Sequence, residues 1–376
     1  MKIALVTETY PPEINGVAMT LSQLVNALRD RGHHVQVVRP TQDGAPSETP
    51  NELTVYGLPI PRYPQMRFGL PCGNRLLKAW KLFKPDIVHV ATEGPLGFSA
   101  INVARKLGLP ITSTFHTNFH SYSEHYDAPW MSGIILGYLR WFHNRASCNM
   151  SPTQELCEEL ESHGFQNNEV LGRGVKLDVF NPFLRCETLR SSWGIQNGEL
   201  SIIHVSRLGA EKNYDLLARA YDKIRNEKPD TKFIIVGEGP EYDTLQERLP
   251  YAIFTGAIPL EDRQELGRHY ASADIFLYPS LTETFGNVLT EALASGLAVV
   301  AYDYAAAGKY LKNGDNGLSI PLESEESKFI SASLQVAQDP NLRSTLQTGA
   351  RNTAHKLDWT PVIDTFETLL KRHANQ

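Results

Sequence analysis

The sequence predicts an α/β protein made of two doubly wound, Rossmann-like domains, each a parallel β-sheet covered by helices, that face each other across a cleft. The chain has 376 residues, which exceeds what one hydrophobic core usually supports. A strand, a helix and a second strand are predicted near the N-terminus, and the same pattern starts again near residue 201. The predicted strands are short, apolar and separated by helix-length segments, which is typical of parallel sheets buried on both faces.

The first half starts with one such strand, helix and strand. Residues 3–6 are an apolar run of strand length, residues 17–31 have helical periodicity, and residues 35–38 are apolar and β-branched. Gly32 follows the helical pattern directly, which is a common signal for the end of a helix. Residues 41–51 contain Pro, Ser and Gly and predict a mobile loop.

The second half repeats the pattern, with predicted strands at 201–205 and 232–236 around a helix at 214–227. A shorter helix is predicted at 287–295, closed by Gly296 in the left-handed conformation that commonly ends a helix. The other buried strands predicted from apolar runs are 86–90, 111–115, 253–255, 275–278 and 297–301.

Turn signals place the joint between the domains at residues 180–198, which contain Asn-Pro and Asn-Gly pairs. We therefore expect a first domain at 1–185 and a second domain at 186–355. A C-terminal helix at 356–376 is expected to pack back on the first domain. Ligands of open α/β sheets bind outside the carboxyl ends of the strands, so we expect a ligand site in the cleft.

The composition is that of an ordinary soluble globular protein, with 41% hydrophobic and 21% charged residues. A net charge of −6 argues against nucleic acid as the main partner. The four cysteines contain no CxxC pair, which fits a reducing compartment and no structural metal. The N-terminal apolar run is too short for a signal peptide or a membrane span, so we expect a cytoplasmic protein.

The segment 280–291 places two carboxylates on either side of a glycine at the start of the short helix. Glu283 precedes the helix, Gly286 lies at its start and Glu291 lies about one turn inside it. The first backbone N–H groups of a helix attract anions, and carboxylates accept hydrogen bonds from hydroxyl groups. The pattern favours a sugar joined to a phosphate. The alternative is that both glutamates are capping or dipole residues.

Two cations lie in the loop that follows the strand at 201–205. The guanidinium of Arg207 and the ammonium of Lys212 are suited to hold a diphosphate at the entrance of the next helix. The alternative is a pair of solvated loop cations. Because this loop and the Glu283 segment both follow strands of one sheet, we expect them at the same edge.

The first half contributes two further candidates. Gly16, at a helix start, allows a phosphate or sugar to approach the backbone closely, unless it only forms a turn. His116 ends a predicted strand and is placed to bond a sugar hydroxyl or to stabilise charge on a reacting group, unless it is a loop histidine without a catalytic part. The absence of a GxGxxG motif argues against a nicotinamide or flavin cofactor.

Together these motifs resemble the retaining nucleotide-sugar glycosyltransferases of the GT-B fold, in glycosyltransferase family four. Pattern, order and spacing agree along the whole chain. The greatest likeness is to GDP-mannose-dependent α-mannosyltransferases that act on glycolipids. The motifs that carry the resemblance are Asn15-Gly-Val17, His116-Thr-Asn-Phe119, Ser206-Arg-Leu…Glu-Lys212, Val236-Gly-Glu-Gly239, Glu283-Thr-Phe-Gly…Glu291 and Tyr302-Asp-Tyr-Ala-Ala-Ala307.

The resemblance implies that domain 1–185 lies on the acceptor side and that domain 186–355 binds the nucleotide sugar. It also implies a role for each matching position, and no cofactor and no metal ion. In agreement, no Asp-x-Asp follows a predicted strand to hold a divalent ion. One departure is Ala307-Gly-Lys309, where many family members carry a glutamate. The implied catalytic residues are His116, Glu283, Arg207 and Lys212; the donor diphosphate is held by Gly16, Arg207, Lys212, Gly286, Asn287 and Val288, the transferred sugar by His116, Glu283 and Phe285, the ribose by Glu291, and the base by Gly237 and Ile258.

The implied reaction is transfer of a hexose, mannose from GDP-mannose, to a glycolipid or other glycan acceptor with retention of configuration. A UDP-sugar-dependent glucosyl or sulfoquinovosyl lipid transferase is the alternative within the family. A non-catalytic nucleotide-sugar-binding protein, a dehydrogenase and a nucleotide-sugar epimerase are alternatives of other classes. The presence of all the implied catalytic residues favours an active enzyme.

Residues 75–84 predict an amphipathic helix that either rests on the inner face of an anionic membrane or packs on the sheet with its basic side in solvent. Aromatic residues in 119–142 either line the acceptor side or belong to the core. The basic side of the predicted helix carries Arg75, Lys78 and Lys81, and its apolar side carries Leu76, Leu77, Trp80 and Phe83.

Overall fold

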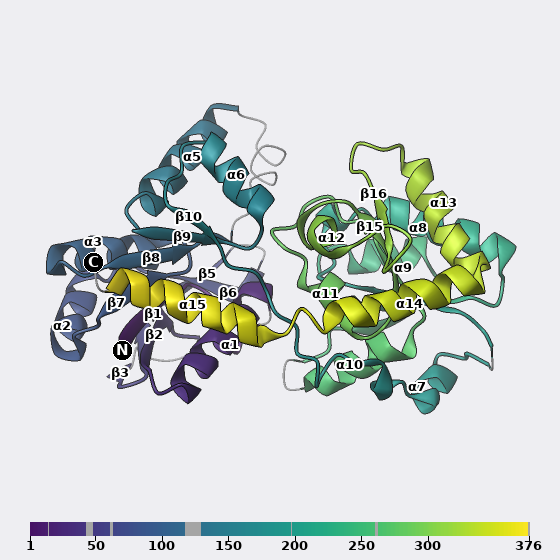
Figure 1. Ribbon diagram of the computed structural model, residues 1–376, viewed down its shortest axis with the longest axis horizontal. Coiled ribbons are helices and arrows are strands. Elements are labelled where there is room, and N and C mark those ends of the chain that lie inside the picture. The colour runs from purple at the N-terminus through teal and green to yellow at the C-terminus, as the bar shows by residue number, and fades with distance from the viewer. Residues whose placement is uncertain are drawn as a thin grey trace. The chain divides into compact units, whose positions relative to one another are not determined.

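The computed structural model describes residues 1–13, 15–42, 48–60, 63–116, 129–196, 198–259 and 262–374 (Figure 1). Two compact units make up this part of the chain. Unit 1 consists of Met1–Gly172 with Thr360–Gln376, and unit 2 of Arg173–Trp359. The segment at 180–198 lies inside unit 2, where it contains the 3-10 helix η1 (Pro182–Leu184) and the helix α7 (Glu187–Ser192).

Unit 1 is built on a mainly parallel sheet with a separate hairpin. The strands are β1 (Lys2–Val6), β2 (His34–Pro40), β3 (Glu48–Thr49), β4 (Glu52–Val55), β5 (Gly57–Ile60), β6 (Tyr63–Gly69), β7 (Ile87–Val90), β8 (Ile111–Thr114), β9 (Cys148–Ser151) and β10 (Asn168–Val170). Within the described ranges the order of the eight-stranded sheet is β10-β9-β8-β7-β1-β2-β4-β3, and β5 pairs with β6. Only the β3–β4 and β5–β6 pairs are antiparallel among the strands described.

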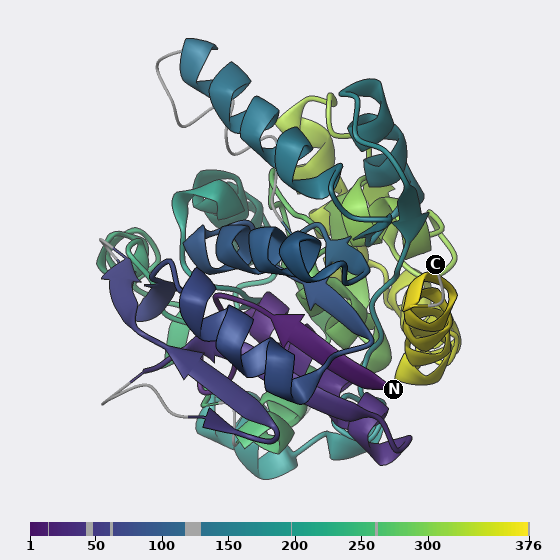
Figure 2. The same ribbon diagram turned by 90° about the vertical axis from the view of Figure 1, so that its left-hand side faces the viewer.

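Helices cover the sheet of unit 1. On one face, Leu76 and Trp80 pack in a core with Ala4 and Val88 from the strands. The C-terminal helix also belongs to this unit: Figures 1 and 2 show it, in yellow, along the sheet, and its Phe366 ring lies 5.0 Å from that of His89. The helices are α1 (Gly16–Asp30), α2 (Gly73–Phe83), α3 (Pro95–Leu107), α5 (Pro129–His143), α6 (Gln154–Ser162) and α15 (Trp359–Ala374).

Unit 2 contains a fully parallel sheet. Its strands are β11 (Ser201–Val205), β12 (Lys232–Val236), β13 (Ile253–Gly256), β14 (Ile275–Tyr278), β15 (Ala298–Tyr302) and β16 (Leu318–Ile320). They are arranged in the order β13-β12-β11-β14-β15-β16. The order therefore reverses between β11 and β14, and at such a switch point the loops after neighbouring strands diverge and leave a crevice.

In unit 2, neighbouring residues of a strand pack in two separate cores, because side chains of a strand alternate between the faces of a sheet. Ile202 packs with α8 and α13, whereas Ile203 packs with α10, α11 and α14. Both faces are thus apolar, which explains the continuous apolar runs in the sequence. The helices are α8 (Tyr214–Glu227), α9 (Tyr242–Arg248), α10 (Arg263–Ser272), α11 (Asn287–Ala294), α12 (Ala305–Tyr310), α13 (Glu326–Gln338) and α14 (Pro340–Ala354), with the 3-10 helix η2 (Ala210–Lys212).

The α/β class and the two parallel sheets predicted from sequence are confirmed, and β11, α8 and β12 have the predicted bounds. The sequence analysis missed β9 and β10, whose polar residues hide their strand character. It also missed the antiparallel strands. The loop predicted at 41–51 is wrong in part, because Glu48–Thr49 form β3; residues 43–47 lie outside the described ranges.

No helix in the described residues has both the length and the apolar character required to cross a membrane.

Glu8 holds together three elements of unit 1 at the carboxyl end of β1. Its carboxylate accepts hydrogen bonds from the backbone N–H of Leu96, at 2.9 Å in α3, and from that of Gly69 in β6. Its own backbone N–H donates to Thr92 Oγ1 at 2.8 Å. Burial raises the pKa of Glu8 to about 7, although the backbone N–H groups oppose this rise.

We predict that Glu8 makes the stability of the protein depend on pH. The folded chain binds this proton more tightly than the unfolded chain, so the free energy of unfolding falls as the pH rises from the usual pKa of 4.5 to about 7. The fall amounts to about 3 kcal/mol at most. Urea unfolding of the wild type and Glu8→Gln between pH 5 and 8 measures it, with the exposed Glu161→Gln as control. Identical pH dependence in the wild type and Glu8→Gln would contradict the prediction.

Candidate functional site

The loops that follow β11 and β14 meet at the switch point of the unit 2 sheet. The backbone N–H of Leu281, after β14, donates to the carbonyl of Glu211, after β11, at 3.2 Å. Lys212 Nζ contacts Glu283 Oε1 across the same junction. The expectation that the cation loop and the glutamate segment lie at one edge of the sheet is therefore confirmed.

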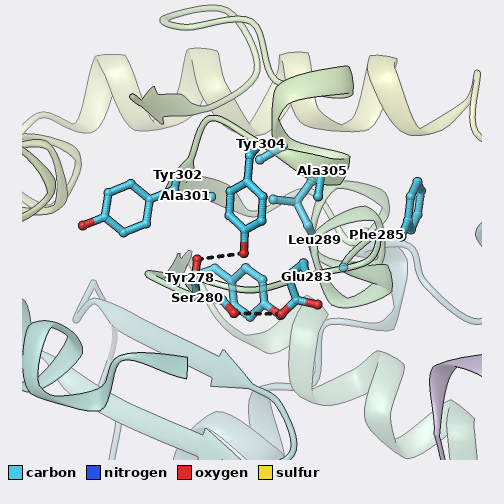
Figure 3. Close-up of a pocket in the computed structure, with 11 residues that line it drawn as sticks. Tyr278, Ser280, Glu283, Phe285, Leu289, Ala301, Tyr302, Tyr304 and Ala305 are labelled. Atoms are coloured by element: carbon cyan, nitrogen blue, oxygen red, sulfur yellow. Dashed lines mark hydrogen bonds between the residues drawn. The ribbon is translucent and has the colours of Figure 1, made fainter. Parts of the chain in front are cut away.

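Three donors surround one oxygen of Glu283. Ser280 Oγ donates to Oε1 at 2.8 Å, and Lys212 Nζ and the Tyr278 hydroxyl also contact Oε1. Tyr304 donates to the carbonyl of Ser280 at 3.0 Å and so fixes the segment from the other side (Figure 3). The side chains of Lys212 and Glu283 are only 11% and 15% exposed, so water screens their attraction weakly.

A small crevice lies behind Glu283. It has a volume of about 10 Å³, which is the room needed by about one water molecule. It is therefore too small for a sugar. The lining residues are Tyr278, Ser280, Glu283, Phe285, Gly286, Leu289, Ala301, Tyr302, Tyr304, Ala305 and Ala307 (Figure 3).

The start of α11 matches the sequence prediction in position, and Gly296 after the helix has the predicted left-handed conformation, with a φ of 76°. Gly286 is the N-cap residue with a φ of 87° and has no side-chain cap. Only glycine adopts this left-handed conformation without strain. The carbonyl of the preceding Phe285 accepts a hydrogen bond from the N–H of Ala306 at 2.8 Å. The first turn, with Asn287 and Val288, thus carries the backbone N–H groups typical of anion sites.

Glu291 lies one turn into α11 and is buried, with 9% exposure. Arg263 Nη2 contacts its Oε1 at 2.7 Å, and the Tyr270 hydroxyl donates to its Oε2 at 3.2 Å. Burial raises the pKa of Glu291, and the nearby Arg263 opposes the rise. The sequence analysis missed both partners. Their spacing of seven residues, two turns along α10, is the signal that places them on one helix face.

Gly237 supports the cation loop by close packing. Its φ is 139°, and a Cβ atom built there would lie 1.9 Å from the carbonyl oxygen of Ser206. The next turn residue, Glu238, accepts a hydrogen bond from the N–H of Leu208 at 2.8 Å. Close packing alone therefore explains why position 237 is a glycine, without any contact to a ligand. Ile258 is half-buried against the core that contains α10 and α11.

Three predicted residues remain, one in the cation loop of unit 2 and two in unit 1. Arg207 is half-exposed and forms an ion pair with Glu211 at 2.7 Å. Gly16 and His116 belong to unit 1. Gly16 is the first residue of α1, and His116 follows β8 and is half-buried.

Of the two arrangements predicted for residues 75–84, the structure shows the one in which the helix packs on the sheet. Leu76 and Trp80 are 0% and 1% exposed and pack in the unit 1 core, because the sheet needs an apolar cover on this face. Lys78, Lys81 and Leu82 are exposed. Of the aromatic segment, residues 117–128 lie outside the described ranges.

In the parts of the chain that the structure describes, no group of three or more His, Cys, Asp or Glu side chains is placed to hold a metal ion.

We predict that Lys212 and Glu283 stabilise unit 2 cooperatively. Lys212→Met and Glu283→Gln are each expected to lower the free energy of unfolding by about 1–3 kcal/mol, because each leaves a largely buried charge without its oppositely charged partner. The double variant should cost clearly less than the sum of the two. Urea unfolding of the four proteins measures this coupling.

The exposed pair Lys223–Glu227, at 3.2 Å on α8, is the matched control, with an expected coupling of about 0.5 kcal/mol or less. A coupling between Lys212 and Glu283 no larger than that of the control pair would contradict the prediction.

Comparison with known proteins gives matches along both units. Residues 14–179 match the family described as Glycosyltransferase Family 4, and residues 186–353 match Glycosyl transferases group 1. A GDP-mannose-dependent alpha-mannosyltransferase of Mycobacterium tuberculosis is 31% identical, over 97% of this chain and 94% of that protein. Alpha-monoglucosyldiacylglycerol synthase of Streptococcus pneumoniae is 30% identical, over 83% and 73%.

Two solved structures share the fold. Sucrose-phosphate synthase from Thermosynechococcus elongatus aligns with a TM-score of 0.79 at 17% identity, covering 99% of this chain and 98% of that chain. Anabaena HepE in complex with UDP-glucose aligns with a TM-score of 0.77 at 18% identity, covering 99% and 100%. Both alignments extend along both units.

Proposed function

Because the chain belongs to glycosyltransferase family 4 and has the GT-B fold, we propose that this glycosyltransferase moves mannose from GDP-mannose to a glycolipid or other glycan acceptor with retention. The observation that carries the proposal is the Lys212–Glu283 pair at the switch point, beside the start of α11. It combines a cation and backbone N–H groups for a diphosphate with a carboxylate for sugar hydroxyls.

The choice of donor rests on the relatives. The relative from Mycobacterium tuberculosis is named as a GDP-mannose-dependent enzyme and matches almost the whole chain. The streptococcal relative is named for a product on diacylglycerol, which supports a lipid acceptor. HepE, by contrast, is solved with UDP-glucose. A UDP-sugar-dependent lipid transferase is therefore the second candidate function.

In the proposed mechanism the protein stabilises the leaving diphosphate and fixes the sugar. Lys212 and Arg207, with the backbone at Gly286, Asn287 and Val288, balance the negative charge that grows as the glycosidic bond breaks. Cations and backbone N–H groups do this without a divalent ion. The acceptor hydroxyl attacks the face that the diphosphate leaves and passes its proton to a phosphate oxygen.

The other positions bind the rest of the donor. Phe285 and Glu283 hold the transferred sugar. The carboxylate of Glu291 accepts a hydrogen bond from a ribose hydroxyl on its remaining lone pairs. Gly237 and Ile258 lie against the base. As the family resemblance implies, we assign Gly16 to the diphosphate and His116 to the sugar near the reacting carbon. Orientation of the two substrates by these contacts lowers the entropic part of the barrier.

A donor screen tests the proposed function. GDP-mannose, UDP-glucose and related donors are incubated with the protein, with and without diacylglycerol and glycosyldiacylglycerol, and nucleotide release is measured. We expect GDP release from GDP-mannose that depends on an acceptor and persists in EDTA. Selective UDP release would favour the second candidate, loss of activity in EDTA would contradict the metal-free mechanism, and a lack of release from every donor would refute the function.

In the same assay Lys212→Ala and Glu283→Ala are each expected to reduce the rate of transfer by about a hundredfold or more. Removal of one hydrogen-bond donor that stabilises a transition state typically has an effect of this size. Lys223→Ala, an exposed lysine on α8, is the matched control and should keep wild-type activity. Wild-type rates in either site variant would remove that residue from the mechanism.

We further propose that α2 contacts an anionic membrane through Lys78, Lys81 and the exposed Leu82, which is 73% exposed. Sedimentation with phosphatidylglycerol vesicles at low salt should show binding that Lys78→Gln with Lys81→Gln weakens about thirtyfold, since each lysine near such a surface contributes about 1 kcal/mol. Lys223→Gln with Lys328→Gln is the charge-matched control. Equal binding of the two double variants, or no binding by the wild type, would contradict the proposal.

A further inference from the structure

Glu283 does not use its two carboxylate oxygens in the same way. The contacts from Lys212, Tyr278 and Ser280 all end on Oε1. Among the described residues no hydrogen bond to Oε2 is recorded. Figure 3 shows the second oxygen of Glu283 pointing away from Tyr278. One oxygen thus receives all three contacts, and the other accepts no hydrogen bond from the described residues.

Tyr278 is the least adjustable of the three donors. It is the last residue of β14, its side chain is 5% exposed, and its ring stacks on that of Phe276 at 5.4 Å. Burial and the charge of Glu283 raise the pKa of Tyr278 well above its usual value. The hydroxyl therefore remains a donor across the physiological pH range. A rigid ring on a central strand keeps that donor in one place.

Ser280 and Lys212 are held less directly. Ser280 lies in a loop whose backbone is fixed by Tyr304, at 3.0 Å, and by the Leu281–Glu211 bond, at 3.2 Å. Lys212 has a long side chain, and the proposed function also assigns its charge to the diphosphate. Rotation of a carboxylate about its last torsion meets only a low barrier. The buried tyrosine is therefore the contact that best sets the plane of the Glu283 carboxylate.

We propose that Tyr278 is a positioning residue: it fixes Oε1 of Glu283 so that Oε2 is presented to a hydroxyl group of the transferred hexose. This inference rests on the proposed function, in which Glu283 binds that sugar. Tyr278 itself does not touch the substrate. Its effect is to restrict Glu283 to the orientation that holds the sugar ready for transfer.

The expected effect lies in turnover rather than in donor affinity. A Glu283 carboxylate that rotates still binds the sugar, but in several orientations of which few react. The nucleotide and the diphosphate retain their own contacts. Tyr278→Phe is therefore expected to lower kcat about 10- to 100-fold, the range for loss of a hydrogen bond to a charged group, and to change the KM for the donor less than about threefold.

Tyr302→Phe is the matched control. Tyr302 is the last residue of the neighbouring β15, is 3% exposed and lines the same crevice, but its hydroxyl points away from Glu283 in Figure 3. Both variants remove one buried hydroxyl and keep the ring. Thermal unfolding shows whether each one folds. A purely structural role for Tyr278 would lower the unfolding temperature of Tyr278→Phe and leave its kcat per folded molecule at the wild-type value.

Two measurements decide the inference. If the wild type transfers a hexose and the kcat of Tyr278→Phe equals that of Tyr302→Phe, the inference is refuted and the proposed function stands. If the wild type transfers no hexose from any nucleotide sugar, the proposed function fails. Crystal structures of both variants then still test whether Tyr278 fixes the Glu283 carboxylate. We expect more than one orientation of this carboxylate in Tyr278→Phe only. A single, unchanged orientation in Tyr278→Phe would overturn the inference.

Discussion

The ion pair between Lys212 and Glu283 is the interaction on which the candidate site depends. It joins the loops after β11 and β14, the two strands between which the order of the unit 2 sheet reverses. At such a point nothing in the sheet itself holds the two loops together, because their helices leave toward different faces. A cation from one loop and a carboxylate from the other close this junction. The same two groups are suited to a diphosphate and a sugar, so the structural bond and the proposed binding site use the same residues.

Close backbone packing and buried hydroxyl groups fix that pair in space. Gly237 lets the turn after β12 pack directly on the carbonyl of Ser206, at the base of the cation loop. Gly286 turns the chain into α11 through a left-handed conformation. Tyr278 and Ser280 then donate to Oε1 of Glu283, and Tyr304 donates to the carbonyl of Ser280. A preorganised site of this kind needs little rearrangement as charge develops in a reaction.

The sequence was sufficient for the strands and helices with strong patterns and for the residues that carry charge. The apolar β-branched runs predicted β11, β12 and β14, and the segment 287–295, which ends at Gly296, predicted α11. Residues that act through a neighbour left no such signal. In the sequence, Tyr278 is an ordinary strand residue, and only the fold shows its contact with Glu283. Likewise, Arg263 and Tyr270 are ordinary helix residues in the sequence, and the fold places both against Glu291. For Trp80 the helix pattern predicted an apolar side but left open whether a membrane or the sheet covers that side, and the structure shows Trp80 buried.

The central claim is that the switch point of unit 2 binds the nucleotide diphosphate of the donor. Calorimetric titration of the full chain with GDP tests it most directly, because it requires neither an acceptor nor turnover. The account predicts saturable binding by the wild type, binding weakened at least about tenfold in Lys212→Met through loss of one charged contact, and wild-type binding in the exposed control Lys223→Met. Equal affinity of the wild type and Lys212→Met for GDP would contradict it.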